Sequence, residues 1–124
     1  MGRTKNILNV LVNKLISILN KIKLYHWTAR EYSTHKVLDG LHTDLSNKVD
    51  LLVESYIGKY GTVKKLVINT EERVSGNKKD IIKFLKKTYK HIIKLYKLND
   101  REFQNIIDEM LVILNQSLYL LHLS

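Results

Sequence analysis

The chain has 124 residues, five glycines, no proline and no cysteine, and its formal net charge at pH 7 is +9. The length suits a single domain over residues 1–124, and the lack of cysteine excludes disulfides and thiolate metal sites. Any metal site must therefore use His, Asp or Glu side chains. No stretch approaches 18 uncharged apolar residues, so we expect no membrane-spanning segment. We expect a cytoplasmic or nucleoid-associated protein, or one that is packaged in a virion.

Two amphipathic segments in the first half of the chain predict long helices. Leucine and isoleucine recur at helical spacing from about Thr4 to Trp27. A second apolar stripe runs from about Ser33 to Ile57. Ser33 or Thr34 is the expected cap at the start of this second helix, because a hydroxyl can accept from the free N–H groups of a first turn.

The middle connection runs from Gly58 to Gly76 and separates the two halves of the chain. Its apolar residues predict one short helix from Val63 to Ile68. The polar residues that follow, from Thr70 onward, predict a loop.

Two further amphipathic helices are predicted after this connection. One begins near Asn77, where Asp80 completes a capping-box arrangement, and the other begins near Asn99, again with an acid, Glu102, three residues on. The predicted fold class is therefore all-α: a four-helix bundle with a middle crossover connection, which is the ferritin-like plan.

Histidines and acids on the second helix form the most informative pattern. At about 100° per residue, His35, Asp39, His42, Asp50 and Glu54 fall within an arc of about 120° on an ideal helix. That arc borders the apolar stripe of the same helix, so we expect these carboxylates to be partly desolvated and to need a positive partner. Nitrogen and carboxylate ligands without thiolate suit iron or manganese, and can also bind zinc.

Distance along the helix predicts that any such site is shared between two chains. His35 and Asp50 are 15 residues apart, which is about 22 Å along a helix, so one ion cannot contact both within one chain. Two antiparallel copies of the helix across a two-fold axis would bring the His35 and Asp39 end of one chain to the Asp50 and Glu54 end of the other. A homodimer is therefore the smallest expected assembly.

Three short segments also carry a family resemblance. Residues 23–28, 35–39 and 50–54 contain, in order, a His-Trp pair, a His-x-x-x-Asp motif and an Asp-x-x-x-Glu motif. This combination resembles the Dps family, the mini-ferritins of starved cells that protect DNA. The resemblance implies oxidation of ferrous iron by hydrogen peroxide or dioxygen, and it allows a dodecamer as well as a dimer.

The resemblance also assigns roles to residues. The metal ligands that it implies are His26, His35 and Asp39 from one chain, and Asp50 and Glu54 from its partner. Trp27 is expected to line the site where oxidation takes place. His42 matches no ligand position of the family, and we interpret it as a core or interface histidine.

Lysines dominate the polar face of the third predicted helix. A solvated face is the simplest interpretation of such a stripe, but the net charge of +9 also suits binding to DNA through its phosphates, without sequence specificity. The residues expected to contact phosphates are Lys83, Lys87, Lys90 and Lys94. The alternative to an iron-oxidising enzyme is thus a non-enzymatic, basic DNA-binding or particle-packaging protein on the same fold.

Overall fold

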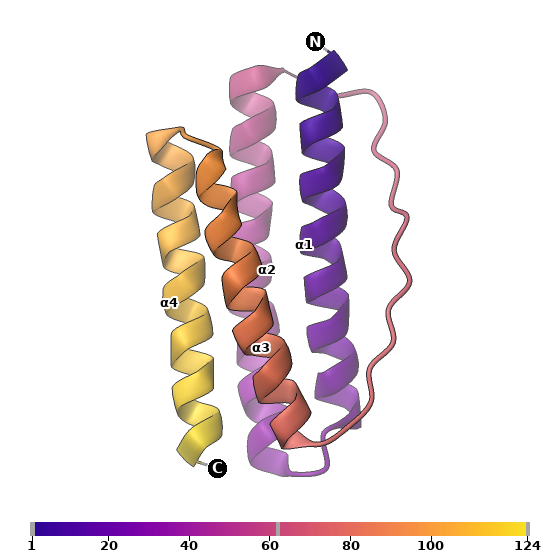
Figure 1. Cartoon of the computed structure of the whole chain (residues 1–124), viewed down its shortest axis with the longest axis vertical. Coiled ribbons are helices and arrows are strands. Elements are labelled where there is room, and N and C mark those ends of the chain that lie inside the picture. Colours follow the sequence, from indigo (N-terminus) through magenta and orange to yellow (C-terminus); the bar gives the residue numbers. More distant parts are fainter. Residues whose placement is uncertain (1, 62, 124) are drawn as a thin grey trace.

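A computed structural model describes residues 2–61 and 63–123, with side chains from Ile7 onward. Four long helices run side by side: α1 (Gly2–Thr28), α2 (Tyr32–Tyr60), α3 (Lys78–Ile93) and α4 (Arg101–Leu123) (Figure 1). A short 3-10 helix, η1 (Lys94–Lys97), follows α3 directly. The described residues contain no strand, so the all-α, four-helix prediction is confirmed.

Apolar side chains from all four helices meet in one core. They recur at three- and four-residue spacing, so each helix presents one apolar stripe to the centre. Burying one such side chain contributes about 1.5–3 kcal/mol. The largest fully buried side chains are Leu8, Leu15, Ile22, Leu38, Leu41, Leu45, Leu52, Leu85, Ile92, Phe103, Ile107 and Met110.

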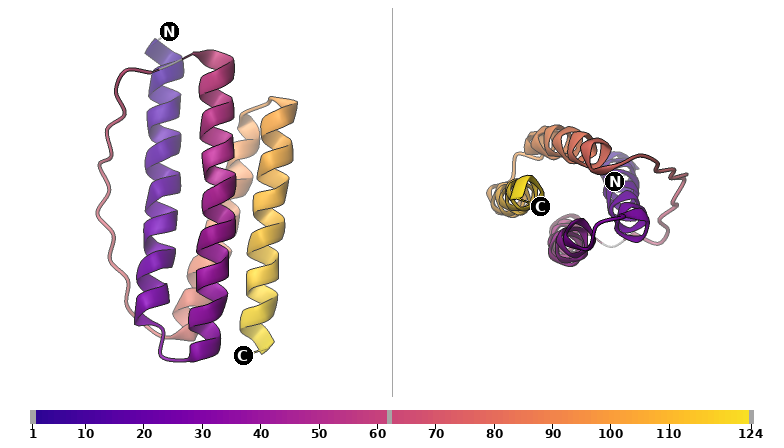
Figure 2. Two further views of the ribbon diagram at one scale, coloured as in Figure 1. Left: turned by 180° about the vertical axis from the view of Figure 1, so that it is seen from behind. Right: turned by 90° about the horizontal axis from the view of Figure 1, so that it is seen from below.

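The order of packing differs from the order of the chain. α1 packs against α2, α2 packs against α4, and α3 packs against α4. The segment between α2 and α3 runs along the outside of α1 from one end of the bundle to the other (Figures 1 and 2). As a result α3 runs parallel to α2 (Figure 1).

The prediction of a short helix in the middle connection is wrong. Residues 63–77 are extended or bent, without helix, because α1 offers this segment a hydrogen-bonding partner. The amide of Asn13 donates to the carbonyl of Val67 over 2.7 Å, and its oxygen accepts from the N–H of Asn69 over 2.7 Å. The oxygen of Asn9 accepts from the N–H of Val67 over 3.0 Å. Side chains of α1 therefore satisfy backbone groups that a helix would have satisfied internally.

The starts of three helices differ slightly from the predictions. α1 begins at Gly2, two residues before the predicted Thr4. α2 begins at Tyr32 after Glu31, whose side chain makes no capping bond, so neither Ser33 nor Thr34 is the cap. α4 begins at Arg101, two residues later than expected.

The capping box at the start of α3 is confirmed. The side chain of Asn77 accepts from the N–H groups of Lys79 and Asp80, and the Asp80 carboxylate accepts from the N–H of Asn77.

By length and composition alone, α4 is long and apolar enough to cross a membrane, which the count of uninterrupted apolar residues did not anticipate. The core helix of a bundle meets the same criterion. Phe103, Ile107, Met110 and Leu114 of α4 are fully buried among the other helices, so packing in the core accounts for part of its composition. Other apolar residues of the same helix are exposed, namely Val112, Tyr119, Leu120 and Leu123.

Candidate metal half-sites

Two histidines join the end of α1 to the start of α2 through a reciprocal pair of hydrogen bonds. The Nδ1–H of His26 donates to the carbonyl of His35 over 2.9 Å, and the Nδ1–H of His35 donates to the carbonyl of His26 over 2.9 Å. The rings stack with 3.9 Å between their centroids and an interplanar angle of 19°. We call this pair the histidine clasp.

Helix geometry explains the position of the clasp. α1 ends at Thr28, so the carbonyl of His26 is among the last four of the helix and lacks an intrahelical N–H partner. The His35 ring supplies that partner. The His26 side chain is 7% exposed, and its Nδ1 would be costly to bury without an acceptor.

The clasp also fixes which ring nitrogens are free. A carbonyl oxygen can only accept a hydrogen bond, so the Nδ1 of each ring must carry a hydrogen. In a neutral ring the Nε2 atom then has the lone pair that can bind a ligand. A metal-binding histidine commonly has this arrangement, with one nitrogen held by a carbonyl and the other open to the ion. The rings of His26 and His35 are therefore held in place through Nδ1.

Asp39 adds a carboxylate to this end of α2. Its Oδ1 lies 4.0 Å from Nε2 of His26, which is too long for a hydrogen bond. A cation that bonds both atoms at about 2.1 Å would need the carboxylate to move slightly closer. The Asp39 side chain is 51% exposed and has room to move. His26, His35 and Asp39 together form what we call the nitrogen half-site.

Asp50 and Glu54 lie one turn apart further along α2, and we call them the carboxylate half-site. Both side chains are exposed, so the partial desolvation expected from the sequence is not found within one chain. The helical wheel placed them beside the apolar stripe, but α1 and α4 do not cover that part of α2. Their burial would require a second molecule.

One chain does not bring the two half-sites together. Within residues 2–61 and 63–123 no group of three or more His, Asp or Glu side chains is placed to hold a metal ion. The distance of about 22 Å along α2 explains why His35 and Asp50 do not meet. The same finding means that His26, His35 and Asp39 alone are not placed to hold an ion.

Exposed aromatic side chains border the nitrogen half-site. Trp27 is 66% exposed, and the Nζ of Lys23 lies 5.8 Å from the centroid of its ring. The ring of Tyr32 is also exposed and lies 6.3 Å from that of His35. Sequence reasoning missed Tyr32, although its position three residues before His35 places it on the same face of α2.

His42 is half-buried beside the nitrogen half-site. Burial lowers its pKa, the positive charges of Lys23 and His26 lower it further, and Asp39 acts in the opposite direction. The sequence prediction of a core or interface position is compatible with this environment. His42 is thus favoured as a neutral imidazole at neutral pH.

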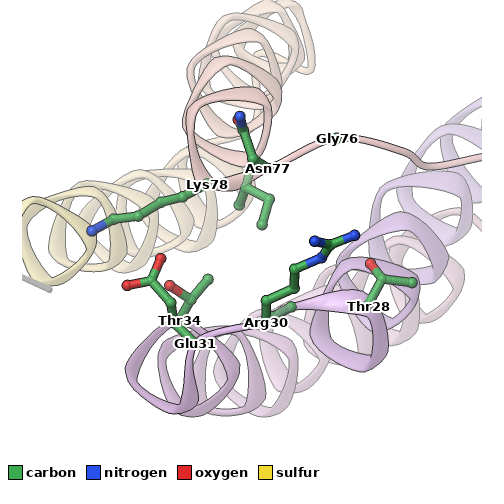
Figure 3. Close-up of a pocket in the computed structure, with 9 residues that line it drawn as sticks. Thr28, Arg30, Glu31, Thr34, Gly76, Asn77 and Lys78 are labelled. Carbon is green, nitrogen blue, oxygen red and sulfur yellow. The ribbon is translucent and has the colours of Figure 1, made fainter.

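A cavity of about 420 Å³ lies at the same end of the bundle, between the α1–α2 loop and the start of α3 (Figure 3). Arg30 and Glu31 line it from the loop, and Asn77, the residue before α3, lines the opposite side. Thr34 also lines the cavity, with an Oγ1 that is buried and has no hydrogen-bond partner among the described residues. Neither clasp histidine lines the cavity, so it lies beside the half-site.

The lysines assigned to DNA lie on the outer side of α3 and its extension. Lys83, Lys87, Lys90 and Lys94 are all exposed, and Lys94 is the first residue of η1. Because these lysines are exposed, they could contact a polyanion. Lysines that only face solvent would be equally exposed, so exposure does not distinguish the two interpretations.

Residues 26–121 match a family described as a family of unknown function (DUF5856). The chain belongs to this family. The matched range contains both half-sites and the lysines of α3, while most of α1 lies before it. The description of the family names no activity, so membership leaves the chemistry open. No curated protein and no solved structure matches the chain.

Proposed function

We propose that this protein is a Dps-like mini-ferritin that binds ferrous iron between two copies of the chain and oxidises it. The observation that carries the proposal is the histidine clasp. Its hydrogen bonds use the Nδ1 atoms and leave the Nε2 atoms of both rings for a ligand. His26 lies at the end of α1, and His35 lies one turn of α2 before Asp39. The carboxylates that would complete the site, Asp50 and Glu54, are exposed on the same helix.

A two-fold axis passing between residues 44 and 45 of antiparallel α2 helices would complete the site. It would place His35 opposite Glu54 and Asp39 opposite Asp50, twice per dimer. Each site would then have two nitrogens and three carboxylates, a ligand set that suits iron or manganese and can also hold zinc.

Residues on the same face of α2 suit this contact. Thr43 and Ser46 would oppose each other near the axis, and such short side chains let two helices approach to about 8–10 Å. Tyr32 of one chain would oppose Ile57 of the other, covering an exposed ring with an aliphatic side chain.

The proposed chemistry needs only positioning and charge from the protein. Two ferrous ions lose one electron each, and one hydrogen peroxide molecule accepts both electrons and becomes two hydroxide ions. The carboxylates favour the ferric state, because the added positive charge strengthens their attraction to the ion. Removing iron and peroxide together would protect nearby DNA. Trp27, exposed next to the clasp, would line the site.

The topology supports the finer assignment of a ferritin-like fold. The connection from α2 to α3 runs the length of the bundle (Figure 1), and α2 packs against α4 instead of against its neighbour in sequence. Two antiparallel pairs joined by a long crossover define the ferritin-like bundle.

The second candidate is a basic DNA-binding or packaging protein without catalysis. The exposed lysine stripe of α3 favours it. If the stripe binds DNA, affinity falls steeply with salt and depends little on sequence. Changing Lys83, Lys87, Lys90 and Lys94 to Glu would then abolish DNA binding and leave iron oxidation intact. If the parent does not bind DNA even at low salt, this candidate is wrong.

Solution mass and ferrous oxidation, measured on the same sample, test the iron proposal. We expect a dimer or a multiple of it, up to a dodecamer, and oxidation by hydrogen peroxide or dioxygen that is much faster than without protein. A strictly monomeric protein that binds iron tightly would contradict the shared site. A dimer without oxidation would favour the second candidate.

A further inference from the structure

A second cavity of about 420 Å³ lies between α1 and α3. These two helices do not pack closely in the described part of the chain, unlike the pairs α1–α2, α2–α4 and α3–α4. Residues of both helices line the opening between them. We call it the α1–α3 groove.

The groove gathers positive charge from two helices. Lys14 and Lys21 line it from α1, and Lys83 and Lys87 line it from α3, together with His91. Two negative groups lie nearby. Asp80 lines the groove, but its carboxylate already accepts from the N–H of Asn77 over 2.9 Å. Glu72 belongs to the connection outside α1 and accepts from the amide of Asn20.

His91 is the titratable group of the groove that these lysines affect. Its side chain is half-buried. Burial lowers its pKa, and the charges of Lys14, Lys94, Lys87 and Lys21 lower it further. Lysines from opposite walls therefore act on one point inside the cavity.

The groove differs from an ordinary solvated lysine face. On such a face the lysines belong to one helix surface, whereas here they line one cavity from two helices. The Nζ of Lys21 lies 6.0 Å from the centroid of the Phe84 ring, which in turn lies 5.4 Å from the ring of Tyr25. Four lysines line the cavity against one carboxylate, Asp80, and Glu72 faces only Lys21 among the four. Positive charge is therefore in excess, which is unfavourable without a further counter-charge.

We propose that the α1–α3 groove binds a short run of consecutive phosphates. Each internal phosphate of a polyphosphate or a nucleic-acid strand carries about one negative charge, so two or three consecutive phosphates match the excess positive charge of the lysines over Asp80. The source is either a free polyphosphate or the backbone of a nucleic-acid strand. The proposal does not rest on the metal site, whose residues do not line the groove.

Binding of sodium tripolyphosphate, measured by isothermal titration calorimetry at physiological salt, tests the proposal. The full chain should bind one tripolyphosphate per groove. The double variants Lys14→Gln/Lys21→Gln and Lys83→Gln/Lys87→Gln, one for each wall, should each weaken binding by about tenfold or more, because each removes two charge-assisted contacts. Thermal melting checks that each variant is folded.

The matched control is Lys79→Gln/Lys86→Gln. These lysines are exposed on α3 and do not line the groove, yet the change in net charge is identical. We expect less than about a twofold effect, since distant exposed charges are screened. Equal weakening by all three double variants would overturn the proposal, because the ion would then respond only to net charge. A parent that does not bind tripolyphosphate at low salt would overturn it as well.

A single-stranded oligonucleotide distinguishes the two sources of phosphate. If the groove accepts a nucleic-acid strand, the oligonucleotide competes with tripolyphosphate, and Lys14→Gln/Lys21→Gln weakens both. If it accepts only free polyphosphates, the oligonucleotide does not displace tripolyphosphate. A polyglutamate peptide that competes as well as tripolyphosphate would overturn the assignment of phosphate as the ligand.

Discussion

The two ends of α2 carry the two halves of the proposed metal site, and the fold treats them differently. At the first end, hydrogen bonds and stacking fix His26 and His35 before any ligand arrives. At the other end, Asp50 and Glu54 are exposed on the helix surface. The contacts of the nitrogen half-site thus contribute to the stability of the folded chain. The carboxylate half-site becomes part of a metal site only when a second chain covers it.

The largest expected effect is on metal binding, and it should be similar at both ends. His35→Ala and the double variant Asp50→Asn/Glu54→Gln should each weaken iron binding by at least about 100-fold, because each removes direct ligands from the same site. Calorimetric titration with ferrous iron under anaerobic conditions measures this. Asp44→Asn, an exposed acid on α2 outside both half-sites, should bind iron as the parent does.

The stability of the same variants without metal should differ. His35→Ala removes the partner of the His26 carbonyl and should cost about 1–3 kcal/mol. Asp50→Asn/Glu54→Gln should stay within about 0.5 kcal/mol of the parent, or be more stable, because two close carboxylates repel each other. Urea unfolding measures both. Equal destabilisation by the two variants would contradict the contrast between the half-sites.

Thr34 tests the packing around the nitrogen half-site. Its side chain is 2% exposed and its hydroxyl is unpartnered among the described residues. Thr34→Val should therefore raise the free energy of unfolding by about 1 kcal/mol. The matched control is Thr88→Val, since the equally buried hydroxyl of Thr88 donates to the carbonyl of Phe84 over 2.9 Å and its removal should be destabilising. A loss of stability in Thr34→Val would mean that this hydroxyl has a partner in solution.

The smallest expected effect is a dependence of stability on pH near the nitrogen half-site. Burial and the charges of Lys23 and His26 place the pKa of folded His42 below the ordinary value of 6.5. Below about pH 6.5 the unfolded chain binds the proton more readily, so the free energy of unfolding falls as the pH falls toward the folded pKa. His42→Gln should reduce this decline in urea unfolding between neutral and acidic pH. His122→Gln, which changes an exposed histidine of α4, should leave it unchanged.

Local signals in the sequence predicted much of the fold. Apolar spacing located all four helices, and Asn77 with Asp80 located the start of α3. The cap of α2 was predicted wrongly, because Thr34 lies inside the helix and is buried. The extended middle connection was not predictable, because it depends on Asn9 and Asn13 contacting a segment more than 50 residues away.

The sequence named candidate ligands but not their arrangement, and their role in metal binding stays a prediction. Spacing along α2 indicated that one chain could not close the site. The histidine clasp depends on where α1 ends and how tightly the chain turns into α2, and no pattern in the sequence reports that geometry. The exposure of Asp50 and Glu54 depends on which faces of α2 the neighbouring helices leave open.

Subunit exchange tests the shared site most directly. His35→Ala and Asp50→Asn/Glu54→Gln are each inactive in ferrous oxidation on this account, since each lacks part of both sites of its homodimer. After the two proteins are mixed, a heterodimer has one intact site and one site that lacks all three groups. We expect partial oxidation activity to return in proportion to the heterodimer, as quantified by native mass spectrometry. Confirmed heterodimer without recovered activity would contradict a metal site shared between two chains.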